Sequence, residues 1–163
     1  MNLPIGEVIS QRIDFRELDA KKLVESFYDK KFSGYIVATI EGFDGVEEGA
    51  ILFKEGNLVA SVYEYDNYGI SVFGDSAFPQ VFNSFGADFV VADIISLTNQ
   101  QVDLVTAFND RWKITKPVDK NSVGKLIPKQ FSADYAKQTL SEVLTKSESK
   151  KDLFKKFGLS GLG

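Results

Sequence analysis

The side chains best suited to chemistry are carboxylates, which gather around two predicted turns. Glu41, Asp44, Glu47 and Glu48 surround the first turn, and carboxylates are the oxygen ligands that hard cations prefer. The alternating acidic spacing of a calcium-binding loop is absent, so a solvated loop is the simpler interpretation. We therefore predict no metal site here.

The second acidic group, Glu64, Asp66 and Asp75, surrounds the next predicted turn. Paired carboxylates act as acid and base in glycosidase-like sites. Nothing in their spacing shows a shared cleft, so we interpret them as surface residues. A small-molecule or metal-ion sensor, or an enzyme, remains an alternative function that would use these carboxylates with nearby tyrosines. Those tyrosines are Tyr63, Tyr65 and Tyr68.

The composition excludes several reaction classes, because the chain contains neither cysteine nor histidine. Catalytic triads with histidine, cysteine nucleophiles, thiolate zinc sites and iron–sulfur clusters are therefore ruled out. We predict a non-enzymatic protein without a cofactor. The chain shows no signal peptide and no apolar stretch long enough to span a bilayer, which favours the cytoplasm.

Charge divides the chain into two parts. Residues 1–112 carry 8 Lys/Arg and 18 Asp/Glu, whereas residues 113–163 carry 11 Lys and 5 Asp/Glu. The change in composition predicts an acidic body over 1–112, a linker or surface-hugging connection over 113–131, and a basic helical extension over 132–163. The net charge of −4 argues against general nucleic-acid binding by the body.

The basic extension ends in an amphipathic pattern. Apolar residues repeat at helical spacing between lysines, and such a short helix is stable only against a surface. Four surfaces are candidates to bind this helix: the chain's own acidic body, a partner protein, an anionic membrane and nucleic acid. The charge division favours the first two. The candidate partner-binding residues are Lys151, Leu153, Phe154, Lys155, Lys156, Phe157 and Leu159.

The remaining pattern predicts an α+β fold. Short β-rich runs, two of them joined by a glycine-containing turn at Glu55–Asn57, predict an antiparallel sheet of four or five strands. Helical spacing predicts helices at about 15–30, 76–85 and 98–109, so that two or three helices pack on the sheet. A linker and short C-terminal helices follow.

Local signals place the ends and faces of these helices. Asp14 is the predicted N-cap of the first helix, and Pro79 lies in the first turn of the second. Lys146–Ser149 is a predicted polar gap between two short C-terminal helices, the last of them capped by Ser149. The predicted inward residues of the third helix are Val102, Leu104, Val105 and Phe108.

The phenylalanines of the body are predicted core residues, and a surplus of them would form an exposed apolar patch that marks an interface. They are Phe73, Phe78, Phe82, Phe85 and Phe89.

The segment from Phe32 to Ser61 resembles a known module. A helix, a glycine, a strand and the pattern Gly49-Ala50-Ile51-Leu52-Phe53-Lys54-Glu55-Gly56-Asn57-Leu58-Val59-Ala60 resemble the PATAN-type hairpin and an archaeal family of uncharacterised proteins. The segment Lys150–Leu159 is similar to a short basic tail motif of some archaeal members. The resemblance implies a small α+β domain that mediates protein–protein contacts in signalling, and it implies no catalytic residue.

These observations predict a protein-interaction or adaptor module whose body and basic tail contact partner proteins, with a homodimer among the alternatives. Association with nucleic acid through residues 113–163 is the remaining alternative.

Overall fold

The predicted hairpin forms two neighbouring strands of the sheet. In the computed structural model β3 (Gly45–Lys54) pairs with β4 (Asn57–Tyr65) in antiparallel register. The turn between them, Glu55-Gly56, has φ values of 49° and 82°, so both residues adopt left-handed backbone conformations. Two-residue hairpin turns of this type favour glycine at such positions, which explains Gly56. The hairpin prediction is confirmed.

The structure describes residues 1–156 and 158, without the side chains of Leu153 and Phe154. Contacts divide the chain into two compact units, Met1–Ser132 and Ala133–Gly163. Among the described residues, no helix combines the length and apolar content that a bilayer crossing requires.

The sheet has six antiparallel strands, in the order β1-β6-β2-β3-β4-β5. The others are β1 (Glu7–Asp14), β2 (Gly34–Gly42), β5 (Ile70–Phe73) and β6 (Val90–Ser96). The predicted number of four or five strands was one short, because β5 has only four residues and lies at an edge. Such a short run shows too little alternation to be recognised in the sequence.

Three of the helices of the first unit correspond to predicted segments. They are α1 (Ala20–Asp29), α2 (Phe78–Ser84) and α3 (Asn99–Phe108), and a fourth helix, α4 (Lys120–Leu126), follows. Pro79 does lie in the first turn of α2. Thr98 forms a capping box with Gln101 at the start of α3.

Two details of these helices correct the sequence prediction. The N-cap of α1 is Asp19 rather than Asp14, whose carboxylate instead pairs with Arg16. On α3, Val102 and Val105 face the core, but the side chains of Leu104 and Phe108 are 58% and 81% exposed. The inward stripe of α3 is therefore narrower than predicted.

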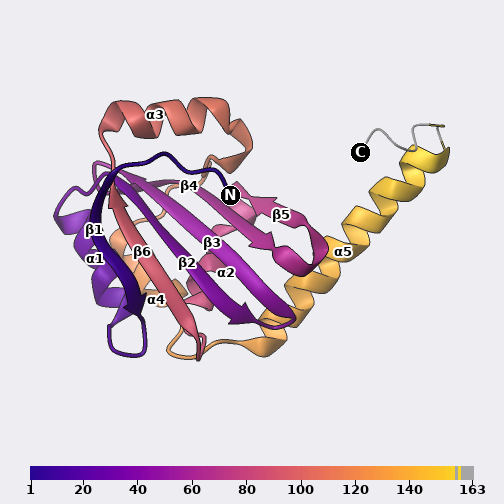
Figure 1. The fold of residues 1–163 in the computed structure, drawn as a ribbon, viewed down its shortest axis with the longest axis horizontal. Coiled ribbons are helices and arrows are strands. Elements are labelled where there is room, and N and C mark those ends of the chain that lie inside the picture. The colour runs from indigo at the N-terminus through magenta and orange to yellow at the C-terminus, as the bar shows by residue number, and fades with distance from the viewer. Residues whose placement is uncertain (157, 159–163) are drawn as a thin grey trace. The chain divides into compact units, whose positions relative to one another are not determined.

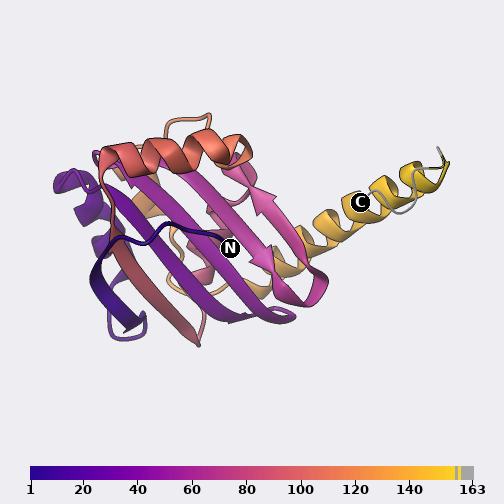
Figure 2. The ribbon, with the colours of Figure 1, turned by 45° about the horizontal axis from the view of Figure 1, so that its top comes forward.

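Helices cover the two faces of the sheet unequally (Figures 1 and 2). Helices α1, α2 and α4 lie on one face, here called the back. Helix α3 and the segment 1–6 cross the opposite face, the front, near one end of the strands. The back core includes Phe53 and Phe82, and the front core includes Tyr35 and Trp112. No helix of residues 1–132, all of which are described, covers the other end of the front.

The stretch 113–131 runs along the first unit. Lys113 forms a β-bridge with Ala60, and the amide of Ile114 donates to the carbonyl of Val59 at 2.9 Å. Val123 of α4 is fully buried, and the hydroxyl of Tyr28 donates to the carbonyl of Val118 at 2.8 Å. Hydrogen bonds and two buried apolar residues, Val123 and Ile127, thus hold this basic stretch.

The second unit contains one continuous helix, α5 (Ala133–Lys156), of 24 residues. The predicted polar gap at Lys146–Ser149 is wrong, because these residues are helical and Ser149 caps nothing. A polar run without glycine or proline contains no strong helix breaker, so the loss of apolar spacing there did not mark an end.

The contribution of Trp112 to the front core can be tested by mutation. We expect Trp112→Ala to lower the free energy of unfolding by about 3–5 kcal/mol, because it empties a site in the front core. The neighbouring control, Phe108→Ala, removes an exposed ring and should change it by less than about 0.5 kcal/mol. Urea denaturation measures both, and equal losses would contradict the assignment.

Candidate functional site

The uncovered end of the front carries an unusual set of exposed apolar side chains. Phe89, Val91 and Val46 are 60%, 48% and 47% exposed. Carboxylates and one threonine lie among them on the same strands. We call this set the open face, and its members are Thr39, Glu41, Val46, Glu48, Phe89, Val91 and Asp93.

The register of three strands fixes the pattern of the open face. Thr39 on β2 lies opposite both Val91 on β6 and Glu48 on β3. Glu41 lies opposite Val46 and donates its amide to the carbonyl of Phe89 at 3.1 Å. Because directly opposed side chains lie about 5 Å apart, apolar and acidic groups form one mixed surface.

Several charges border this surface. The guanidinium of Arg16 lies 5.6 Å from the centre of the Phe89 ring, and it also binds Asp14. Asp93 accepts a hydrogen bond of 2.7 Å from the backbone amide of Arg12. The open face itself contains three carboxylates and no lysine or arginine, and the bordering Arg16 is paired with Asp14, so the surface favours cations.

The amino group of Met1 approaches the border of the open face. It lies 3.1 Å from Oε2 of Glu64 and 4.0 Å from Oε2 of Glu48, which are opposite one another on β4 and β3. Its hydrogen bond with Glu64 raises the pKa of the amino group. Burial raises the pKa of Glu48, although the amino group opposes that effect.

The first acidic group of the sequence is divided between the two faces. Glu41 and Glu48 belong to the open face, whereas Glu47 points to the back, because adjacent residues of a strand alternate. Asp44 accepts a hydrogen bond from the hydroxyl of Tyr68 at the surface. Within the described part of the chain, no three acidic side chains are placed to hold a metal ion.

The second acidic group does not converge either. Glu64 binds the amino group of Met1, and Asp75 accepts hydrogen bonds from Thr115, which hold the pKa of Asp75 below its ordinary value. Tyr63 and Tyr65 are buried, with their rings in edge contact. The hydroxyl of Tyr65 donates to Oε1 of Gln80 in the interior. The structure thus does not bring these residues together around a pocket.

Glu47 is a buried carboxylate, with its side chain 2% exposed. The hydroxyl of Tyr63 donates to Oε2, while Oε1 has no hydrogen-bond partner. The carboxyl group packs against Gly42. A Cβ atom added at Gly42 would lie 2.2 Å from Cδ of Glu47, which is too close for any side chain there. Burial raises the pKa of Glu47, although the Tyr63 hydroxyl and the backbone amides of Phe43 and Asp44 favour the charged form. Because Oε1 is buried without a hydrogen-bond partner, a negative charge on Glu47 destabilises the folded state.

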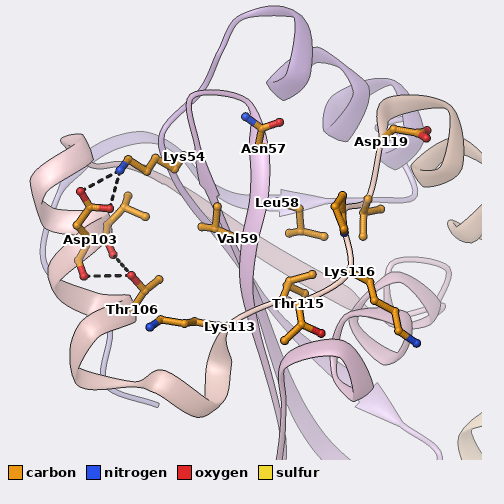
Figure 3. A pocket seen from close by; sticks show the side chains of 14 residues that line it. Lys54, Asn57, Leu58, Val59, Asp103, Thr106, Lys113, Thr115, Lys116 and Asp119 are labelled. Carbon is orange, nitrogen blue, oxygen red and sulfur yellow. Dashed lines mark hydrogen bonds and ion pairs between the residues drawn. The ribbon is translucent and has the colours of Figure 1, made fainter.

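A shallow groove of about 520 Å³ lies beside α3 (Figure 3). Its walls come from α3, the β3–β4 hairpin and residues 113–119. Nζ of Lys54 lies 2.7 Å from Oδ1 of Asp103 across one end of the groove, and Nζ of Lys113 lies 2.6 Å from Oδ1 of Asp110. Two of the three lysines that line the groove thus pair with carboxylates, and the third is Lys116.

The basic residues of the C-terminal extension lie in the last turns of α5. Lys151, Lys155 and Lys156 are exposed. Leu153 and Phe154 are within the helix, but their side chains are outside the described part of the structure, as are the residues Phe157 and Leu159. The predicted apolar stripe therefore stays a prediction.

The open face contains residues that the sequence prediction missed. The sequence prediction placed Phe89 in the core and gave Val46 and Val91 no part in a surface. The available signal was Val90-Val91, since a strand with apolar residues on both faces must expose one of them wherever only the other face is covered.

Glu47 generates a prediction about pH. The carboxyl group of Glu47 has a higher pKa in the folded than in the unfolded protein, so its contribution to stability is fully present below the unfolded pKa. This contribution is lost as the pH rises through the folded pKa. Glu47→Gln replaces the carboxyl group with an amide that does not ionise. The variant should therefore have a free energy of unfolding about 1 kcal/mol higher at pH 7 and little changed at pH 4. The control Glu41→Gln, on the exposed side of the neighbouring strand, should show no such difference. Chemical denaturation at both pH values is the measurement, and equal destabilisation by Glu47→Gln at both would contradict the prediction.

Comparison with known proteins gives a family for most of the body. The family described as "Uncharacterized protein conserved in archaea (DUF2226)" matches residues 1–109, which confirms the expected archaeal family. No curated protein and no solved structure matches the chain. The likeness to PATAN-type hairpins stays a prediction, as does the tail motif, which lies beyond the matched residues. Since the match spans well over half of the sequence, the chain belongs to this family of uncharacterised archaeal proteins.

Proposed function

We propose that this protein is a non-enzymatic interaction module whose open face and basic C-terminal segment contact partner proteins. The observation that carries the proposal is the exposure of Phe89, Val91 and Val46 on a sheet face that no helix of residues 1–132 covers. Adjacent exposed apolar residues with a polar rim are typical of protein interfaces.

The chemistry of the open face supports binding rather than catalysis. Its carboxylates alternate with apolar side chains across three strands instead of converging on one point. A partner that covers Phe89 and Val91 removes apolar area from water, and the surrounding carboxylates select for a basic partner. Neither effect requires a histidine, a cysteine or a metal ion.

The basic end of α5 provides a second contact of opposite charge. Its exposed lysines, among them Lys151 and Lys155, suit an acidic partner surface. A module with one acidic and one basic surface joins two partners of opposite charge, which is the property of an adaptor.

The open face is tested by capture from native extract with three purified chains. Val91→Asp places a charge beside Phe89 and Thr39 on the open face and should abolish capture of the partners that depend on this face. Leu104→Asp is the matched control, because it changes a residue of similar exposure on α3, and it should capture what the unchanged chain captures. Both sites are exposed, so both variants should unfold within about 0.5 kcal/mol of the unchanged chain.

Truncation after Thr145 extends the same experiment to the basic segment. It should remove a different group of partners, identified by quantitative mass spectrometry. Identical capture by all the chains would contradict the proposal. So would a purified activity that Glu41→Gln alone abolishes, because that result would make the open face an active site.

A further inference from the structure

We infer that the open face binds the basic C-terminal end of α5 from a second copy of this chain, so that two copies exchange these helices reciprocally. The inference rests on the proposed binding role of the open face and names its occupant. Helix α3 covers one half of the front of the sheet, and the open face is the other half.

The covered half shows which kind of element the sheet accepts. Val102 and Val105 of α3 pack against the front core, which includes Leu52 and Ile95. The open face continues the same strands β6, β2 and β3 beyond α3. Three adjacent strands span about 10 Å, which matches the diameter of one α-helix. A second helix therefore fits the vacant half.

The carboxylates specify the charge of that helix. Asp93 on β6 and Glu48 on β3 lie on the two sides of the open face, and Glu41 on β2 lies between these strands. A helix lying across the three strands thus meets a carboxylate on each of them. Basic residues beside an apolar stripe complement this arrangement.

The end of α5 has this distribution of residues. At 100° per residue, Lys151 and Lys156 lie on either side of the helix positions of Leu153 and Phe154. Both lysines are exposed.

A second copy is the occupant that the chain itself supplies. Residues 1–132 carry an excess of 6 acidic residues and residues 133–163 an excess of 2 lysines, so each copy presents both halves of the contact. Reciprocal exchange makes two identical contacts and closes the assembly as a symmetric dimer. Attraction between opposite charges makes this dimer sensitive to salt.

The test is charge reversal on each side of the contact, with full-length chains. Glu41→Lys changes the open face, and Lys151→Glu/Lys156→Glu changes the helix. Sedimentation velocity over a range of concentrations should show that the unchanged chain dimerises. Its association constant should be at least ~10-fold smaller in 500 mM than in 50 mM salt. Each charge variant alone should associate at least ~10-fold more weakly than the unchanged chain.

Mixing the two variants is the decisive step. In the mixed dimer, the reversed helix meets the reversed face and the unchanged helix meets the unchanged face. Association should therefore return to within about 3-fold of the unchanged chain. Lys137→Glu, a reversal elsewhere on α5, is the control and should leave association unchanged.

Three outcomes would overturn the inference: a chain that stays monomeric at every concentration, a dimer that neither reversal weakens, and a mixture that does not recover. None of them would remove the proposed function if Val91→Asp still abolishes capture of a partner from extract. Loss of both results would remove the inference and the proposed function together.

Discussion

The structure depends on the antiparallel register of β2, β3 and β6. Successive side chains of a strand point to opposite faces, so the register decides which residues are buried behind the sheet and which lie in front. The two-residue turn at Glu55-Gly56 sets the hairpin register, and the long pairing of β2 with both neighbours extends it. A slip by one residue would bring Glu47 to the front and bury Glu48.

This constraint explains why one acidic run in the sequence has two different roles. Glu47 is enclosed, with one carboxylate oxygen bound by Tyr63 and the other without a partner. Glu41 and Glu48 instead border exposed apolar side chains. Within residues 1–132, three helices cover the back and α3 covers one end of the front, so the same alternation yields a complete core behind and exposed apolar side chains in front.

Much of this fold could be predicted from local patterns. The hairpin, α3 and the α+β class follow from turn chemistry, helical spacing and alternation. The edge strand β5 and the continuity of α5 did not, because four residues show little periodicity and a polar run does not end a helix. The open face was missed for a different reason: whether Val91 is buried depends on how far α3 extends over the sheet, which no local pattern encodes.

The most direct measurement is photocrosslinking from position 91, with a photoreactive amino acid in place of Val91 and equal amounts of unlabelled and ¹⁵N-labelled full-length chains. Isotopically mixed cross-links identify contacts between copies. Binding of the open face to the basic helix of a second copy requires mixed cross-links from position 91 to residues 146–156. Cross-links from position 91 that are never mixed, or mixed ones that avoid this helix, would contradict it.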